Sequence, residues 1–551
     1  MFPLSVRSAA LWLLPPFVVG AALRLFHLAP QVLDGDEVHA VRAAVAMPLG
    51  AILTTYQESD NCIPLSALFR GLLNAGVRLS EMGFRAPSIA SGLLLLALLP
   101  LGAARRRLPR GVAVLFAWLL ALSPLLVFYS RIARSYLPMT FCALAAAAAF
   151  AAWWRTLKPA LGAVYVVLGA LAVWLHLGAA PIVAAPFLYA AGDLAWGKRE
   201  ERRRRLSHLA LLGVGIVLAL AAFLLPARES LARLVAEKRQ AQSVPWETIA
   251  DVLRLQAGTA SPTFTVLFWM GVLGGLAALL AVDRRLGAYT LTLAGVQLLG
   301  IRLLSPLGLA NPLILGRYLL PVLPLLLFWA ACMLALPWSL LAGWGRGGRR
   351  VQGALEAGFF LTLAAHGPLA DRTLWASSFM HHNDFLAFYA PRPRLAPEAV
   401  PYPYREIARI GGRRAVVEYP WSSFAGLRTP YLYQEVHGRR VVVSGPQRLL
   451  FDPALALANA VPPGPEGFCG SGARFLVVHL HVAREEDQIA AAEETRLGER
   501  EMRPDLRRTL RTQAEAMTQG LTTLWGEPTW SAPSLRAWDL DLTCKHRAGK
   551  T

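Results

Sequence analysis

Long apolar segments alternate with short polar segments over the first 370 residues of the chain. A transmembrane helix needs about 20 mostly apolar residues to cross a bilayer. Eleven segments meet this requirement: 9–28, 86–104, 111–128, 135–154, 160–176, 178–196, 206–226, 263–282, 287–304, 313–336 and 351–370. The pattern therefore predicts a polytopic α-helical membrane protein with about eleven transmembrane helices.

The basic residues between these segments predict how the helices are oriented. Arginine and lysine gather at 105–107, 155–158, 198–205, 284–285 and 346–350. With the N-terminus in the cytoplasm, all these groups fall on the cytoplasmic side, as the positive-inside rule requires. The first apolar segment is not followed by a small-residue cleavage site, so we expect it to remain as a helix. The outer, periplasmic side then holds 29–85, 129–134, the turn at His176, 227–262, 305–312 and everything after 371.

Three outer segments are amphipathic rather than fully apolar: 37–50, 62–80 and 229–239. The second of them contains Pro64, Arg70, Asn74 and Arg78. If it crossed the membrane, the loops that follow would be inverted, so we expect an interfacial helix instead. The first outer loop, 29–85, is therefore long and built of helices that lie along the membrane surface.

The character of the chain changes after residue 371, where no further span follows. Five prolines between 391 and 403 indicate a linker. Short β-rich runs follow at 415–419, 440–444, 475–481 and 535–542, with helical patterns near 483–498 and 504–523. We expect a membrane domain at 1–371 and a small periplasmic α/β domain at 372–551. Cys469 and Cys544 flank that domain, either as a disulfide or as two free thiols.

Composition agrees with this class of protein. Hydrophobic residues make up 55% of the chain and charged residues 16%, below the roughly 25% typical of soluble domains. The formal net charge of +20 would suggest nucleic acid in a soluble protein. Here the arginines lie in short loops between apolar segments, so we expect membrane lipids as partners and no nucleic acid.

Three carboxylates, Asp34, Asp36 and Glu37, follow the first apolar segment closely. Carboxylates are costly within a bilayer, so a cluster beside one is either a solvated flank or a site. A carboxylate there can accept a proton from an incoming hydroxyl or amine as a general base. Alternatively, it can bind a divalent cation that holds a phosphate leaving group.

Two arginines lie where the positive-inside rule predicts few. Arg131 and Arg134 are three residues apart on the outer side, between Tyr129 and Tyr136. In a helix they would share one face and could hold a phosphate in bidentate fashion. Anchoring to lipid headgroups is the alternative.

Further candidates lie at the outer ends of later spans. Arg317 and Tyr318 begin the 313–336 span, where the arginine suits the same anion. Arg302 is either a fourth arginine of the set or a snorkelling side chain. A lone histidine such as His176 is more often a packing residue. The adjacent histidines at 381–382 have poor metal-ligand spacing.

Several short motifs occur in a characteristic order along the chain. They are Arg24 to Leu28, Asp36-Glu37, Asn61-Cys62-Ile63-Pro64-Leu65, Gly83 to Ser88, Tyr129-Ser130-Arg131-Ile132-Ala133-Arg134-Ser135-Tyr136, His176, and Arg317-Tyr318-Leu319-Leu320-Pro321. Together they resemble the GT-C glycosyltransferases of the protein O-mannosyltransferase and lipid A aminoarabinose transferase type. The resemblance covers about residues 1–335.

The resemblance implies a polyprenyl-phosphate sugar donor and inverting transfer on the periplasmic side. It implies Asp36 as the general base or acceptor-orienting acid, with Glu37 in support. It places Arg131, Arg134 and Arg317 near the donor phosphate. We further expect Tyr318 beside that phosphate, and the substrates near Asp34, Tyr129, Tyr136 and His176.

The chain also departs from the family pattern. Cys62 stands where the family has histidine, Ile63 where it has proline, and Leu177 where it has tyrosine. Asp34 is an additional acid, which we expect to tune the site rather than to catalyse. These departures leave the sugar, the acceptor and any metal requirement open.

We therefore expect an inner-membrane hexosyl- or pentosyltransferase. Its acceptor would be periplasmic: lipid A, another glycolipid, a polysaccharide or a protein. One alternative is a transporter or flippase of a lipid-linked sugar, which would show ionisable residues at mid-membrane and paired broken helices. The other is a non-catalytic binding protein on the same fold, against which the complete set of acids and arginines argues.

Overall fold

The computed structural model describes the membrane part nearly continuously and the C-terminal part in pieces. The described residues are 6–342 without 27, 29–36, 38–42, 45–46, 57–61, 78, 107, 196–198, 239–242 and 260, scattered positions at 345–354, then 400–419 without 413, 436–443 without 440, 468–469, 473–480 and 504–548. The chain forms two compact units. The first unit comprises Met1–Phe26, Leu49–Leu68 and Arg85–Leu374, and the second comprises His27–Pro48, Phe69–Phe84 and Trp375–Thr551.

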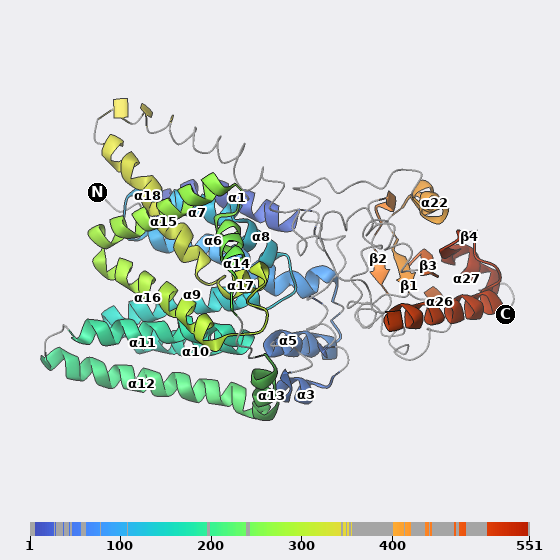
Figure 1. Ribbon diagram of the computed structural model, residues 1–551, viewed down its shortest axis with the longest axis horizontal. Coiled ribbons are helices and arrows are strands. Elements are labelled where there is room, and N and C mark those ends of the chain that lie inside the picture. The colour runs from blue at the N-terminus through green and yellow to red at the C-terminus, as the bar shows by residue number, and fades with distance from the viewer. Residues whose placement is uncertain are drawn as a thin grey trace. The chain divides into compact units, whose positions relative to one another are not determined.

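Helices dominate the chain up to residue 342 (Figure 1). They are α1 (Val6–Leu25), α3 (Leu49–Thr54), α5 (Ile63–Asn74), α6 (Glu81–Ala104), α7 (Arg110–Leu122), α8 (Pro124–Ser130), α9 (Tyr136–Thr156), α10 (Pro159–Leu175), α11 (Ala180–Ala195), α12 (Arg199–Leu224), α13 (Arg228–Lys238), α14 (Trp246–Ala257), α15 (Pro262–Val282), α16 (Arg284–Leu304), α17 (Pro312–Tyr318) and α18 (Leu323–Ala342). Two 3-10 turns, η1 (Leu177–Ala179) and η2 (Leu225–Ala227), join α10 to α11 and α12 to α13.

Six of the described helices are long and apolar enough to cross a membrane, or eight if each of two bent pairs counts as one span. Two shorter apolar helices, Leu11–Leu25 and Pro159–Leu175, join them. These elements account for all the spans expected from the sequence except 351–370, which lies mostly outside the described residues. The chain is a multi-pass membrane protein, and the count of eleven spans stays a prediction.

Two of the expected spans are broken rather than straight. Helices α7 and α8 meet at 58°, and α17 and the first part of α18 meet at 81°. Pro124 opens α8, and Ser123 before it is extended, because a proline disfavours helical geometry in the preceding residue. The two spans expected at 111–128 and 313–336 are therefore each present as a bent pair of helices.

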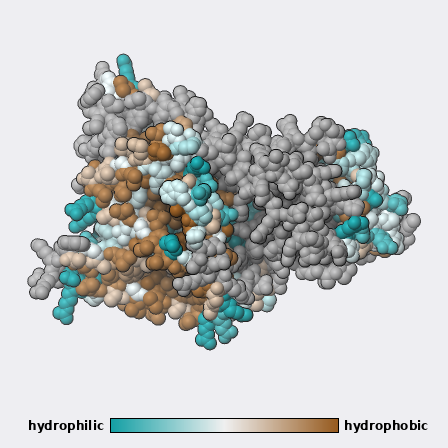
Figure 2. Space-filling view, in the orientation of Figure 1, coloured by the Kyte–Doolittle hydropathy of each residue, from teal (hydrophilic) through white to brown (hydrophobic). Residues whose placement is uncertain are grey.

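The outer faces of the bundle are apolar. Figure 2 shows hydrophobic side chains spread over the helices of the first unit. On α12, Leu211, Val217 and Leu218 are more than 60% exposed, as are Met270 and Leu273 on α15. Exposed apolar surface of this extent is what a lipid-facing helix presents.

The contact between α15 and α18 is unusually close at Gly275. A Cβ atom there would lie 1.7 Å from the carbonyl oxygen of Trp329, so α18 would have to move. Gly271, one turn earlier on α15, has nothing within 4 Å of the same position.

We expect Gly275→Ala to destabilise the bundle by about 1–3 kcal/mol. In a thermal unfolding measurement, Gly271→Ala should match or slightly exceed wild type because alanine favours helix. Equal melting temperatures for the two variants would contradict the close approach.

The second unit contains a five-stranded sheet in the order β2-β1-β3-β5-β4. Its strands are β1 (Val416–Tyr419), β2 (Val441–Val443), β3 (Phe475–His479), β4 (Trp530–Ser531) and β5 (Leu535–Asp539). Strands β2, β1 and β3 are parallel, and β5 is antiparallel to both β3 and β4. Helix α22 (Tyr402–Ile410) packs on one face of the sheet, and α26 (Pro504–Trp525) on the other.

The expected α/β character of this region is confirmed, with differences in detail. The proline-rich stretch was expected to be a linker throughout, but Pro401 caps α22 and Pro403 lies in its first turn. Proline is tolerated there because the first helical N–H groups have no partner within the helix. The last expected strand ends at Asp539, and α27 (Leu540–Ala548) follows it. Cys469 and Cys544 form a disulfide, while the helix expected at 483–498 lies outside the described residues.

Some expected surface helices are present. Helix α5 covers part of 62–80, and α13 matches the amphipathic stretch at 229–239. Neither α5 nor the stretch at 37–50 is a candidate span among the described residues. Half of 37–50 lies outside the described residues. That these segments lie along the membrane surface stays a prediction.

His437 of the second unit is buried and gives that unit a pH dependence. Burial, followed by the charge of Arg439, lowers the pKa of His437 from 6.5 to about 3. Between pH 6.5 and about pH 3, His437 binds a proton in the unfolded chain but not in the folded chain. The free energy of unfolding therefore falls as the pH falls through this range. The slope should approach about 1 kcal/mol per pH unit.

We expect His437→Asn to flatten this dependence. Asparagine can still accept the hydrogen bond that His437 Nδ1 accepts from the backbone N–H of Arg439 (3.1 Å), but it does not titrate. Hydrogen exchange of β1 and β3 peptides in the full-length protein, compared with wild type at each pH from 7 to 4.5, measures the difference. Parallel pH profiles for the two proteins would contradict a role for His437.

Candidate active site

Of the three predicted acids, the structure describes only Glu37. Asp34 and Asp36 lie outside the described residues. Glu37 is helical, only 3% exposed, and belongs to the second unit. Their roles stay predictions. The remaining predicted residues belong to the first unit, and their geometry is described there.

The break after α8 is held to the end of α1 by arginines. Arg131 NH1 donates hydrogen bonds to the carbonyl oxygens of Leu23 (3.0 Å) and Phe26 (2.7 Å). Arg24, 1% exposed, donates from Nε to Ser130 Oγ (3.0 Å) and from its other nitrogens to carbonyls of α1 and α7. Arg131 therefore fixes the helix break, and the phosphate contact expected for it stays a prediction.

Tyr136 is the centre of the cluster that the structure brings together. It is buried as the first residue of α9, and its ring centroid lies 5.4 Å from that of Tyr129 and 5.4 Å from that of His176. The His176 ring in turn lies 5.4 Å from that of Tyr318. Four aromatic residues predicted at separate positions of the sequence thus form one continuous group.

Two guanidinium groups lie on this aromatic cluster. Arg134 Cζ lies 5.6 Å from the centre of the Tyr136 ring, and its NH2 donates to the Tyr136 hydroxyl (3.3 Å). Arg317 Cζ lies 5.2 Å from the centre of the same ring and 5.9 Å from that of Tyr318. Cation–π contacts of this kind hold a guanidinium in place without neutralising its charge. Arg134 is 3% exposed, whereas Arg317 is partly exposed.

A glutamine that the sequence did not single out fixes the position of Tyr318. Gln297 of α16 is fully buried, and its Nε2 donates to the carbonyl oxygens of Gly178 (2.9 Å) and Tyr318 (3.0 Å). Its Oε1 accepts from the N–H of Ile182 (3.0 Å). One side chain therefore joins α16, the start of α11 and the end of α17. A polar residue inside an otherwise apolar span was the available signal.

His176 has a structural role beside its aromatic contacts. It ends α10, and its Nδ1 accepts a hydrogen bond from the N–H of Gly178 (3.1 Å). A Cβ at Gly178 would lie 2.9 Å from that Nδ1 and 3.0 Å from Tyr318 Cδ1. Glycine is therefore needed to bring the two rings together.

The other candidates lie apart from this cluster or outside the description. Arg302 is exposed, and its NH1 lies 3.5 Å from Ser305 Oγ. The histidines at 381–382 are outside the described residues. In the part of the chain that the structure describes, no group of three His, Cys, Asp or Glu side chains could hold a metal ion. Cys62 instead lies 3.4 Å from Ser135 Oγ, beside the cluster.

This arrangement can bind an anion. Two permanently charged side chains from different helix breaks converge on one ring, in surroundings that are mostly buried and aromatic. Guanidinium groups suit phosphate oxygens because of their planar, paired N–H donors. Low exposure strengthens such an interaction because little water competes for it.

The likeness of this chain to known proteins is weak and structural. No protein-family model and no curated protein matches the chain. Among solved structures, it is similar to the crystal structure of ArnT from Cupriavidus metallidurans bound to undecaprenyl phosphate, with 14% identity and a TM-score of 0.44 over 89% of this chain and 95% of that chain. At this identity and TM-score the likeness assigns the chain to no family.

Proposed function

We propose that this protein is a membrane glycosyltransferase that takes a sugar from a polyprenyl-phosphate donor. The observation that supports this most directly is the convergence of Arg134 and Arg317 on the ring of Tyr136. A lipid-linked phosphate can reach such a group from the membrane. Its charge would meet two guanidiniums in surroundings that are otherwise aromatic and apolar.

The proposed chemistry is direct displacement at the anomeric carbon of the donor sugar. The acceptor nucleophile, deprotonated or oriented by Asp36, forms the new bond while the bond from the sugar to the phosphate oxygen breaks. Negative charge then builds up on the departing phosphate, and Arg134 and Arg317 would stabilise it. Glu37 supports the base in this proposal, and Asp34, Tyr129 and His176 contribute to the substrate pocket.

The proposed orientation places this chemistry on the periplasmic side of the inner membrane. Tyr136, His176 and Tyr318 lie at helix ends that alternate along the chain with the ends carrying the basic loops. The positive-inside rule puts those basic loops in the cytoplasm. The acceptor is then a periplasmic molecule such as lipid A, another glycolipid, a polysaccharide or a protein.

The two broken helices favour a second candidate, a transporter of a lipid-linked sugar. Broken helices line the substrate sites of many transporters, and this chain has bends of 58° and 81°. Protein solubilised in detergent separates the two functions. A transferase still makes glycosylated product when mixed with donor and acceptor lipids, whereas a transporter leaves every lipid chemically unchanged.

Asp36→Asn is expected to abolish sugar transfer while leaving expression and membrane insertion intact, because asparagine cannot accept the proton from the acceptor. Mass spectrometry of envelope glycolipids and glycoproteins from a deletion strain would identify the missing sugar and acceptor. The strain is then complemented with wild type, with Asp36→Asn, or with the control Glu229→Gln, which changes an exposed acid on α13. Full restoration of the sugar by Asp36→Asn would rule out its role as the base.

A further inference from the structure

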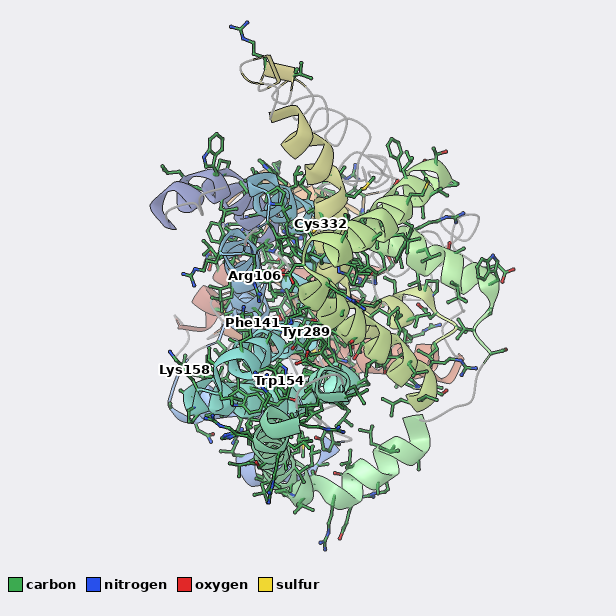
Figure 3. The ribbon with its side chains drawn as sticks, turned by 90° about the vertical axis from the view of Figure 1, so that its left-hand side faces the viewer. Arg106, Phe141, Trp154, Lys158, Tyr289 and Cys332 are labelled. Atoms are coloured by element: carbon green, nitrogen blue, oxygen red, sulfur yellow. A yellow bond between two sulfur atoms is a disulfide. The ribbon has the colours of Figure 1, made fainter. Side chains whose placement is uncertain are left out.

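A cavity lies at the end of these helices opposite to the Tyr136 cluster. Its volume is about 640 Å³, within the range of small-molecule sites. Tyr136 and Trp154 show the separation, because they stand 18 residues apart on α9, which is about 27 Å of helix. Figure 3 views the bundle from this second end and labels Arg106, Trp154 and Tyr289 there. The cavity is thus separate from the candidate active site.

The lining of this cavity is strongly basic over an aromatic floor. Phe150, Trp154 and Tyr289 are buried and form the floor. Five arginines and two aspartates complete the polar part of the lining: Arg106, Arg155, Arg202, Arg205, Arg285, Asp193 and Asp283. The positive-inside rule accounts for arginines in the loops. It does not require arginines from four separate segments to meet around one cavity.

Both aspartates already serve the protein itself. Asp193 Oδ2 accepts a hydrogen bond from Trp154 Nε1 (2.9 Å). Asp283 caps α16 and accepts from the N–H of Leu286 (3.0 Å). The lining still contains five arginines against these two aspartates, so it carries an excess of positive charge.

The arginines also affect one another. Burial and the charge of Arg155 lower the pKa of Arg106, with Asp283 acting weakly in the opposite direction. Arg205 is held in place by Trp154, since its Cζ lies 5.1 Å from the centre of that ring and its NH1 donates to the Trp154 carbonyl (3.2 Å). An anion entering the cavity would relieve the mutual repulsion of these cations.

We propose that this cavity binds a phosphate group, carried by an anionic phospholipid of the adjacent leaflet or by a small soluble molecule. Arginine donors suit phosphate oxygens in particular. Basic pockets between transmembrane helices are known to take lipid headgroups. The aromatic floor suits the glycerol and first methylene groups behind such a headgroup. This proposal does not depend on the transferase activity.

The test compares two double variants with the same change in charge. Arg202 and Arg285 line the cavity, whereas their exposed neighbours Arg203 and Arg284 do not. Purified full-length wild type, Arg202→Glu/Arg285→Glu and Arg203→Glu/Arg284→Glu are each titrated in detergent with phosphatidylglycerol, phosphatidylcholine, and inorganic phosphate or pyrophosphate. Binding is followed by native mass spectrometry and by the shift in melting temperature.

We expect wild type and the Arg203/Arg284 variant to bind the anionic ligand with affinities within about twofold of each other. The Arg202/Arg285 variant should bind at least tenfold more weakly, which corresponds to a loss of about 1.4 kcal/mol. Saturable binding of phosphatidylglycerol, but not of phosphatidylcholine or soluble phosphate, identifies an anionic phospholipid as the molecule that carries the phosphate group. Saturable binding of inorganic phosphate or pyrophosphate identifies a small soluble molecule instead. Equal weakening in both double variants, or no saturable binding of any phosphate compound, would overturn the proposal. This experiment measures binding and not sugar transfer, so its outcome does not depend on whether the protein is a transferase.

Discussion

Under the proposed function, Arg317→Ala is expected to weaken binding of a polyprenyl phosphate such as undecaprenyl phosphate by about 100-fold and to lower transfer at least as much. A hydrogen bond to a charged group contributes about 1.5–3 kcal/mol, and about 2.7 kcal/mol corresponds to 100-fold. Arg317 is better suited to this test than Arg134, because the Arg134 side chain is buried and donates to the Tyr136 hydroxyl (3.3 Å). Removing the Arg134 side chain would therefore disturb the packing around Tyr136 as well.

A lysine at the same position separates charge from shape. Arg317→Lys keeps the positive charge but loses the planar group that lies 5.2 Å from the centre of the Tyr136 ring. Lysine cannot form the paired N–H contacts to a phosphate. We expect binding intermediate between wild type and Arg317→Ala, about tenfold weaker than wild type.

Arg302→Ala is the matched control for both variants. Arg302 is exposed and contacts Ser305 rather than the Tyr136 cluster. Its replacement removes one cation from a neighbouring part of the bundle without touching the ring. Titration of the three purified variants with undecaprenyl phosphate, and a transfer assay at saturating donor, measure both effects. Comparable losses in Arg302→Ala and Arg317→Ala would mean that the cluster has no specific role.

The sequence predicts the membrane helices well because their signal is local. An apolar run of sufficient length has few alternatives to a membrane helix, so spans such as 135–154 and 263–282 reappear as α9 and α15. The paired strands β1 and β3 of the second unit could also be predicted from the sequence. Val416, Val417 and Phe475 belong to short runs of β-branched and aromatic residues, which favour strands. Its added strand β4 is only two residues long and too short to give a pattern.

The helix breaks and their consequences were not predictable from apolar runs alone. Pro124 and Pro321 are compatible with either a kinked or a broken helix, and tertiary contacts decide between them. Arg131 illustrates this point. It donates hydrogen bonds to the carbonyl oxygens of Leu23 and Phe26, and these bonds form only because the end of α1 lies beside it. Gln297 and the basic cavity likewise depend on which segments meet. Sequence reasoning could find the charged residues but not their grouping.

Glu418→Ala is expected to destabilise the second unit by about 3–5 kcal/mol. Glu418 of β1 is fully buried, and its Oε2 accepts a hydrogen bond from the Tyr404 hydroxyl (2.7 Å) and lies 2.6 Å from His479 Nε2. Tyr404 and His479 are buried as well. Alanine would remove the carboxylate to which both groups bond and leave the 3.2 Å contact between the Tyr404 hydroxyl and His479 Nε2. Loss of a hydrogen-bond partner in a buried site costs far more than the bond contributes.

Two further variants show whether the loss comes from the polar groups. Glu515 of α26 is exposed and pairs with Arg511 at 2.8 Å, so Glu515→Ala should cost no more than about 0.5 kcal/mol. Replacing the whole cluster by apolar residues, Tyr404→Phe with Glu418→Leu and His479→Leu, should recover part of the stability lost in Glu418→Ala, because no polar group is then left buried. Hydrogen exchange of β1 and β3 peptides in the full-length protein provides the free energy of opening for each variant. If the triple variant exchanges faster than Glu418→Ala, the three side chains do not act as a polar unit, and the lost stability reflects packing volume around β1 instead.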